Sequence, residues 1–339
     1  MKAVTFGEIM LRLAPEGYLR FLQEPRFQAT FGGGEANVAV SLAQFGVDAA
    51  FVSKLPANDI AEACVRELKS FGVDCSGIAR GGSRMGIYYL EKGASVRPSK
   101  VIYDRAYSAI AEAVPDDFDW KKIFDGADWF HFSGITPALS ENTAKITLDA
   151  VKAAKDAKVY VSCDLNYRKN LWDTKRAQSV MSELMPYVDL CIGNEEDAEK
   201  VFGVKPDDND VTGGELNKKG YEQVARKLTD MFGFDKVACT LRESISASDN
   251  KWGAMLYSQG KAVYSRTYPL HIVDRVGGGD SFSAGLIYAL MSGMSDADAL
   301  EFAVGASALK HTVEGDFNRV TVDEVKRLAG GDASGRVQR

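Results

Sequence analysis

The 339-residue sequence contains few of the residues that build metal centres and disulfide frameworks. Its histidines, His131, His271 and His311, are too far apart for a recognisable metal site. The five cysteines are scattered, odd in number and include no Cys-x-x-Cys pair, which favours buried thiols over metal ligands or disulfide partners.

Long apolar runs and an excess of positive charge are also missing. No uncharged apolar stretch reaches the ~18 residues that a membrane span needs, and the first residues show a strand pattern rather than a signal peptide. A net charge of -6 argues against a nucleic-acid partner, which requires a basic face. We therefore expect a reduced, soluble, cytoplasmic protein without nucleic-acid or membrane partners.

Composition and patterning favour one large α/β domain. Hydrophobic residues at 45% and charged residues at 26% are ordinary globular values. From Trp120 onward, apolar strand patterns alternate with amphipathic helix patterns, which predicts a mostly parallel sheet covered by helices on both faces. The predicted elements are strands at 129–135, 159–164, 188–193 and 236–242 and a helix at 141–155.

Three consecutive glycines, Gly277, Gly278 and Gly279, lead into Asp280 and an apolar helix pattern. Glycines allow the backbone to approach a ligand closely, and the free amides of a first helical turn favour an anion. A carboxylate at that turn can take a proton from a substrate hydroxyl, as phosphoryl transfer to an alcohol requires. The alternative is a helix capped by Asp280, with glycines that serve only a tight turn.

A second glycine-rich loop, 31–34, enters a helix pattern that carries Asn37. Taken alone, this loop is explained as well by helix packing, but two such loops in one chain make coincidence a poor explanation. The β-branched and aromatic residues at 86–91 and 98–105 flank a turn and predict a hairpin. The segment 10–29, with two prolines, is expected to be a peripheral excursion.

The two glycine loops resemble the signatures of the ribokinase-like (PfkB) carbohydrate kinase family. Residues 274–280 resemble its Asp-Thr-x-Gly-Ala-Gly-Asp, with Arg275 in place of Thr and Gly278 in place of Ala, and residues 32–37 resemble its Gly-Gly-x-x-x-Asn. The resemblance extends from Phe6 to about Val322. It implies a three-layer α/β/α fold with a mostly parallel central sheet and a small β-sheet lid.

The same resemblance implies a division of the chain. One kinase domain is expected over 1–322, with lid strands drawn from about 10–35 and 84–107. Residues 323–339 are expected to form a C-terminal helix end and a frayed tail, and the polar segment 205–221 a surface insertion. The lid sheet is expected to pair with a second subunit, which makes the protein a homo-oligomer.

The resemblance also implies residue roles. Asp280 is expected to be the base, and the amides of Gly277, Gly278 and Gly279 to stabilise charge on the transferred group. The sugar is expected to contact Gly33, Gly34, Asn37, Tyr89, Tyr103, Arg105, Ile135, Arg168 and Asp316. The nucleotide is expected to contact Asn166, Asn194, Thr240, Arg242, Gly277, Gly279 and Asn318. Asn194 and Asp197 are expected to position Mg²⁺ through water.

The nucleotide segment departs from the family pattern. Glycines usually follow the threonine that corresponds to Thr240, whereas here Arg242-Glu243-Ser244-Ile245-Ser246 occupies that place. Arg168 could also serve the ATP phosphates rather than the sugar. The contacts at 240–253 therefore stay open.

The arginines indicate the substrate. A carboxylate pairs with a guanidinium in bidentate fashion, whereas a neutral hexose gives little reason to desolvate one. The runs 103–105, 164–168 and 315–318 resemble the 2-keto-3-deoxygluconate kinase branch, so we expect ATP- and Mg²⁺-dependent phosphorylation of a sugar acid's terminal hydroxyl. A fructokinase or other neutral-sugar kinase and a non-catalytic sugar-binding relative stay open, as do the gluco or galacto acid and a monovalent cation such as K⁺.

Overall fold

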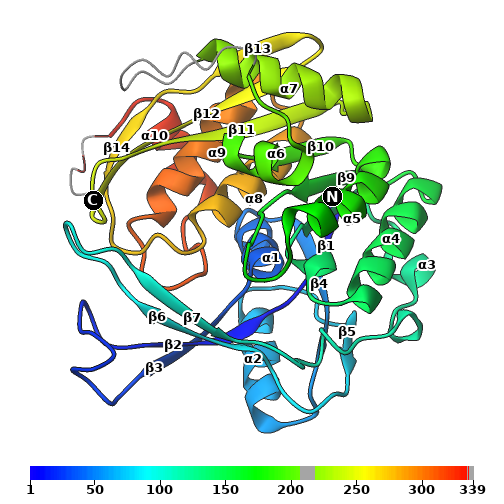
Figure 1. Ribbon diagram of the computed structural model, residues 1–339. Coiled ribbons are helices and arrows are strands. Elements are labelled where there is room, and N and C mark those ends of the chain that lie inside the picture. Colours follow the sequence, from blue (N-terminus) through cyan, green and yellow to red (C-terminus); the bar gives the residue numbers. More distant parts are fainter. Residues whose placement is uncertain (207–217, 334, 336–339) are drawn as a thin grey trace.

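The computed structural model describes residues 1–206, 218–333 and 335 (Figure 1). Its larger sheet has ten strands in the order β13-β12-β11-β10-β9-β8-β1-β4-β5, with β14 paired to β12. From β11 to β5 the neighbours are parallel, whereas β12, β13 and β14 add antiparallel pairs at one side. The strands are β1 (Lys2–Phe6), β4 (Asp48–Leu55), β5 (Ile78–Arg80), β8 (Trp129–Ser133), β9 (Tyr160–Asp164), β10 (Leu190–Gly193), β11 (Lys236–Ser244), β12 (Asp249–Ser258), β13 (Lys261–Tyr264) and β14 (Tyr268–His271).

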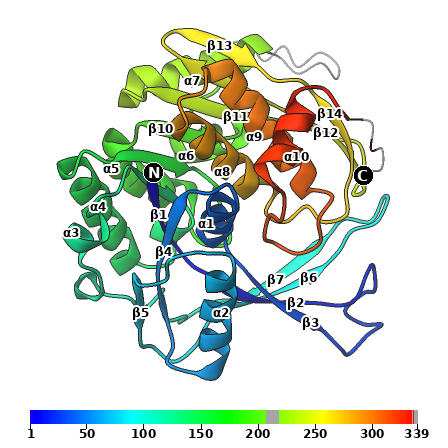
Figure 2. The same ribbon diagram turned by 180° about the vertical axis from the view of Figure 1, so that it is seen from behind.

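Helices cover both faces of this sheet, which confirms the predicted three-layer fold (Figures 1 and 2). One face carries α1 (Gly34–Gln44), α8 (Gly278–Met291), α9 (Asp296–Lys310) and α10 (Val322–Ala329). The other carries α3 (Trp120–Ile123), α4 (Glu141–Asp156), α5 (Thr174–Leu184), α6 (Glu195–Phe202) and α7 (Lys218–Phe232). The helix α2 (Asp59–Ser70) packs beside β4 and α1. Short 3-10 turns lie at Pro115–Asp117, Thr136–Ala138 and Met185–Tyr187.

Strand β8 shows why the central strands are apolar on both faces. All five of its side chains are buried, and Phe130 and Phe132 enter the core cluster on the α4 side, whereas Trp129 enters the cluster on the α8 side. Alternation places successive side chains on opposite faces, and a parallel sheet covered twice by helices buries both sets. The predicted helix at 141–155 follows as α4, whose N-cap Ser140 accepts a hydrogen bond from the Thr143 amide.

A separate four-stranded sheet lies at the edge of the body, in the order β3-β2-β6-β7 (Figure 1). The predicted hairpin is the antiparallel pair β6 (Ile87–Glu91) and β7 (Lys100–Asp104). The excursion at 10–29 contains one strand and the start of another, β2 (Met10–Ala14) and β3 (Gln28–Gly32), which pair with each other. The inward side chains of β2 and β6 form a small apolar cluster against Val276. We call this four-stranded sheet the lid.

The end of the chain extends the core. Val325 of α10 is fully buried against α9, so the packed structure continues past the expected boundary at 322. Most of the insertion expected at 205–221, and the last four residues of the expected tail, lie outside the described residues. Among the described residues, no helix combines the length and apolar character required to cross a bilayer.

Candidate active site

A cavity of about 740 Å³ lies at the carboxyl ends of the parallel strands, between the larger sheet and the lid. Its walls come from the segments that follow β1, β8, β9 and β10, from the inner face of the lid, and from the N-termini of α1 and α8. The two glycine loops, far apart in the sequence, therefore meet in one cavity.

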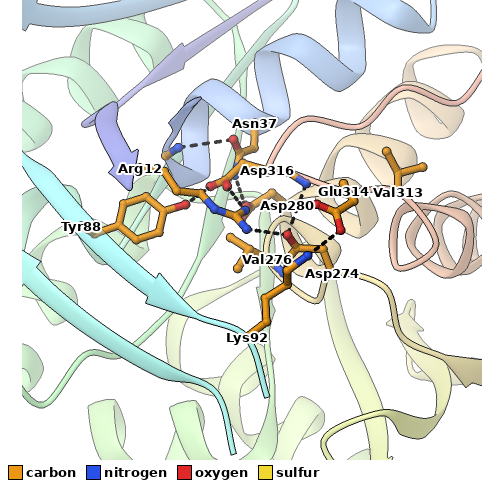
Figure 3. Close-up of polar contacts among 12 residues, drawn as sticks. Arg12, Asn37, Tyr88, Lys92, Asp274, Val276, Asp280, Val313, Glu314 and Asp316 are labelled. Atoms are coloured by element: carbon orange, nitrogen blue, oxygen red, sulfur yellow. Dashed lines mark hydrogen bonds and ion pairs between the residues drawn. The ribbon is translucent and has the colours of Figure 1, made fainter. Parts of the chain in front are cut away.

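Asp280 lies in the first turn of α8, where the helix macrodipole favours negative charge. Its Oδ2 accepts a hydrogen bond of 2.7 Å from Nδ2 of Asn37, while no described residue donates to its Oδ1 (Figure 3). Burial raises the pKa of Asp280 to about 6, against the opposing effect of the Asn37 hydrogen bond. A carboxylate with one oxygen held and the other open is suited to accept a proton.

The turn before Asp280 requires glycine at its first position. Gly277 has φ of 79°, in the left-handed region, and a Cβ placed there would lie 2.2 Å from the carbonyl oxygen of Asp316. Gly277 and Gly279 line the cavity, as predicted for an anion-binding turn. Gly278 does not line it, since its amide donates to the Arg275 carbonyl at 3.3 Å and its α-carbon faces His311. The predicted set of three amides is therefore reduced by one.

The N-terminus of α1 forms the facing wall, with Gly33, Gly34 and Asn37 on the cavity. A Cβ on Gly33 would lie 2.0 Å from the Glu8 carbonyl oxygen, so the loop passes directly over the end of β1. A Cβ on Gly34 would lie 3.6 Å from Oδ1 of Asp280. The open oxygen of Asp280 thus faces the glycine loop predicted to bind the sugar.

The lid contributes Tyr103 and Arg105, both on the cavity as predicted. The Arg105 guanidinium forms an ion pair with Glu8 and lies over the Tyr103 ring at 5.4 Å. Ser108 donates to the other Glu8 oxygen at 2.6 Å. Arg105 is therefore partly neutralised by a buried carboxylate that the sequence had not assigned to the site.

Tyr89 is not on the cavity, which corrects the prediction. Side chains alternate along β6, so Tyr88 faces inward and its hydroxyl donates to Oδ2 of Asp316 at 2.6 Å. Tyr89 faces the other side of the lid, where its ring contacts Phe27 at 5.9 Å. Ile102 of β7 is paired with Tyr89 and therefore lies on the same outer face, beside Tyr89 and Phe27.

Asp316 lies at the cavity, but both of its carboxylate oxygens already have partners in the protein. Oδ1 accepts from Arg12 at 2.6 Å and Oδ2 accepts from Tyr88 (Figure 3). Arg12 also forms an ion pair of 2.6 Å with Asp274, and its side chain is only 4% exposed. Asp316 therefore joins the lid to the body, and its expected contact with the sugar stays a prediction.

The ends of β9 and β10 place Asn166, Arg168, Asn194 and Asp197 on the cavity. Asn194 is the N-cap of α6, and Asp197 completes the capping box by accepting from the Asn194 amide at 3.2 Å. The other Asp197 oxygen accepts from the Tyr167 amide at 3.1 Å. Burial raises the pKa of Asp197 despite these bonds. Arg168 forms no ion pair with any described residue and is free to bind an anion.

Thr240 and Arg242 also line the cavity, and the Arg242 charge lies near Arg275. Arg275 donates to the Ala247 carbonyl at 2.8 Å, and burial together with the nearby Arg242 charge lowers its pKa. Two guanidiniums held near each other favour an anionic ligand. Asn318 does not line the cavity, since its amide donates to Ser281 at 2.8 Å in the core, and this prediction is corrected.

A sequence profile of the pfkB family carbohydrate kinases matches residues 1–230 and 242–321. The chain belongs to this family. This PfkB-family kinase is 35% identical over 331 residues to the 2-dehydro-3-deoxygalactonokinase of Haloferax volcanii, with 97% of each chain covered. It is 27% identical over 319 residues to the 2-dehydro-3-deoxygluconokinase of Thermoproteus tenax, with 92% of this chain and 89% of the relative covered.

Solved structures agree with the family assignment. The crystal structure of a 2-dehydro-3-deoxygluconokinase from Thermotoga maritima is 52% identical to this PfkB-family kinase, covers 98% of each chain and superposes with a TM-score of 0.93. The chain is thus a carbohydrate kinase with the predicted ribokinase-like fold.

The acidic side chains near the cavity determine how the kinase could hold Mg²⁺. Among the described residues, no three His, Cys, Asp or Glu side chains are grouped to hold a metal ion on their own. Mg²⁺ that enters with a nucleotide is held largely by phosphates and water, with one or two carboxylates. Asp164 and Asp197 both line the cavity, but Asp197 accepts two amide hydrogen bonds, whereas no described residue donates to the Asp164 carboxylate, which leaves Asp164 more open to such an ion. Burial and the nearby Asp197 and Asp280 charges raise its pKa, which a cation would oppose.

Several residues of the site were not assigned from the sequence. Glu8, Tyr88 and Asp164 were visible as polar or aromatic residues at strand ends or within strands, but their orientation depends on register. Arg275 was visible as a departure inside the glycine signature. Arg12 had no local signal, because its partners Asp274 and Asp316 lie 262 and 304 positions away.

Proposed function

We propose that this kinase transfers the γ-phosphate of ATP to the terminal hydroxyl of a 2-keto-3-deoxy sugar acid. The preferred acceptor is 2-keto-3-deoxygluconate, which gives 2-keto-3-deoxy-6-phosphogluconate. The carrying observation is the open Oδ1 of Asp280, which faces the Gly34 loop in a cavity that four arginines also line. The names of the similar kinases, which act on 2-dehydro-3-deoxy sugar acids, support the acceptor.

The residues divide the reaction between them. The terminal hydroxyl lies between Asn37 and Asp280, and Asp280 takes its proton as the oxygen attacks the γ-phosphorus. Amides at Gly277 and Gly279 stabilise the charge on the transferred group. Asp164 would help to hold Mg²⁺ that enters with ATP, and the ion would supply positive charge to the phosphates. The lid excludes water that could otherwise take the phosphoryl group.

The carboxylate of the acceptor is assigned to Arg105 and Arg168. Arg168 has no ion-pair partner among the described residues, and Arg105 shares Glu8 with Ser108. Arg242 and Arg275, whose charges lie near each other, are assigned to the ATP phosphates in place of the glycines usual at 242–246. Each of the four arginines on the cavity is thereby assigned to one of the two anionic substrates, the sugar acid or ATP.

ADP release tests the proposal. The enzyme is assayed with ATP and Mg²⁺ against 2-keto-3-deoxygluconate, 2-keto-3-deoxygalactonate, gluconate, fructose, ribose and a blank without sugar. Turnover confined to the keto-deoxy acids supports the proposal, and the ratio of kcat/KM between the first two identifies the preferred epimer. Preference for fructose or ribose would make the enzyme a neutral-sugar kinase and refute the arginine assignment.

We also propose that two copies associate through the outer face of the lid. Phe27 and Ile102 are 39% and 45% exposed, and they share that face with Tyr89. Ile102→Lys places a charge in the centre of this face and should convert a dimer to a monomer in light scattering. Ile60→Lys, at an isoleucine of α2 that is 52% exposed and lies outside the lid, is the matched control. A wild-type protein that is monomeric at all concentrations would contradict the association.

A further inference from the structure

Lys310, the last residue of α9, is fully buried. Lysine is rarely buried without a charged partner, because desolvation of an ammonium is costly. Its Nζ donates to the Val313 carbonyl at 3.1 Å, and in the described parts of the chain it forms no ion pair within 4.0 Å. The mechanism given above does not use this charge.

The Lys310 side chain lies directly behind the anion-binding turn. A Cβ on Gly277 would lie 3.3 Å from Cε of Lys310, on the side of the turn where the Asp316 carbonyl also approaches. The Val313 carbonyl that Lys310 binds belongs to the loop that continues to Asp316. Lys310 therefore contacts both the turn and the loop that supports it.

Charge balance explains why a cation is needed there. Asp274 and Asp316 carry two negative charges, and Arg12 pairs with both but carries one positive charge (Figure 3). Lys310 supplies the second positive charge. Burial is the largest effect on Lys310 and lowers its pKa, and the carboxylates of Asp274 and Asp316 oppose this shift. Without Lys310, a net negative charge would remain behind a turn that must accept a phosphoryl group.

We propose that Lys310 is a positioning residue whose ammonium acts as a built-in cation behind Gly277. It holds the 313–316 loop against the turn and offsets the negative charge that would otherwise repel the transferred phosphoryl group. Since this charge is covalently attached, turnover does not depend on an added monovalent cation such as K⁺. Lys310 does not touch the substrates, and the inference rests on the phosphoryl transfer proposed above.

The test compares Lys310→Ala, which opens space, with Lys310→Met, which removes the charge but fills the space. Kinetics are measured in a buffer whose only cations are Mg²⁺ and a bulky organic cation, and again with K⁺ or NH₄⁺ added. Both variants should lose kcat by about tenfold or more, a smaller effect than loss of a direct anion-hole donor. KM for the sugar should change little. Only Lys310→Ala should regain kcat with K⁺ or NH₄⁺, and the wild type should not respond.

Lys236→Met is the matched control, because Lys236 is 14% exposed and pairs with Asp296 away from the cavity. Its kcat should equal that of the wild type. Stimulation of the wild type by K⁺, unchanged kcat in Lys310→Met, or loss in Lys310→Ala without cation rescue would each overturn the proposal. Should Lys310→Ala fail to fold, kcat of the volume-conserving Lys310→Met decides.

A readout without substrate separates this inference from the proposed acceptor. K⁺ or NH₄⁺ should raise the Tm of Lys310→Ala and leave the Tm of the wild type and of Lys310→Met unchanged. This selective shift can appear even if the true acceptor is a different sugar. Equal Tm responses of all three proteins would show that no cation site is exposed by removal of the lysine, and would refute the inference.

Discussion

Asn37 donates its Nδ2 hydrogen to Oδ2 of Asp280 at 2.7 Å, across 243 positions of sequence. This bond joins the N-terminal turn of α1 to that of α8 and fixes the orientation of the Asp280 carboxylate. Its second oxygen faces the Gly34 loop and has no donor among the described residues. One contact therefore orients the base and leaves its reactive atom open.

Asp280→Asn tests the base directly. The amide preserves shape but cannot take a proton, so kcat should fall by about 10²–10⁴-fold, the contribution typical of general bases. Nucleotide binding by calorimetry should be preserved. The Tm of Asp280→Asn at pH 8 should not be lower than that of the wild type. Burial raises the pKa of Asp280, so its charged form destabilises the folded wild type at this pH. Wild-type turnover in this variant would remove Asp280 from the mechanism.

The pH profile follows from the same carboxylate. Asp280 must be deprotonated to act, so kcat/KM should decline as the pH is lowered through about 6. The Asn37 hydrogen bond lowers the pKa of Asp280, and Asn37→Ala should therefore move this acidic limb to higher pH. Ser41→Ala, one turn further along α1, loses a hydrogen bond to the Asn37 carbonyl and should leave the limb in place. An unshifted limb in Asn37→Ala would contradict the assignment.

Arg12 should stabilise the fold more than any surface ion pair. Its side chain is 4% exposed and contacts Asp274 and Asp316, so Arg12→Met leaves two buried carboxylates without their main partner. The free energy of unfolding should fall by about 3–5 kcal/mol, as for other broken buried pairs. Arg26→Met removes the pair with Glu24 from an arginine that is 86% exposed, where solvent screens the charges, and should leave the free energy of unfolding almost unchanged. Chemical denaturation at pH 7.5 measures both values.

The parts of the site that the sequence predicted are those with local signals. Glycines before Asp280 and around Gly34 indicate places where the backbone can approach a ligand closely and where a helix begins within a few residues. The β6–β7 hairpin was likewise predicted from its own composition. These features need no knowledge of distant partners.

The errors have a common cause in long-range register. Tyr88 and Tyr89 have the same side-chain ring, and only the pairing of β6 with β2 and β7 decides which of them faces the cavity. The residues of Met10–Ala14 indicated only an excursion, and the lid strands expected at about 10–35 came from the family resemblance, because strand conformation here depends on partners from another segment. Lys310 had the pattern of an ordinary helix end, and only the packing of α9 against Gly277 shows its burial.

The relation between Glu8 and Arg105 gives a test of the acceptor carboxylate. Glu8 accepts from Arg105 and from Ser108, so it competes with a sugar acid for the guanidinium. Glu8→Gln removes this negative charge and should lower KM for the keto-deoxy acid, whereas Arg105→Ala should raise it by about 10–100-fold, the value of a charged hydrogen bond.

A neutral sugar should not distinguish these variants. KM values for the acid and for fructose, where fructose is turned over at all, are compared in the wild type, Glu8→Gln, Arg105→Ala and Arg168→Ala. An acid-specific rise in Arg168→Ala alone would assign the carboxylate to Arg168, the arginine without an ion pair among the described residues. Equal effects on acid and neutral sugar in both arginine variants would mean that neither guanidinium recognises the carboxylate, and the acceptor would have to be sought among uncharged sugars.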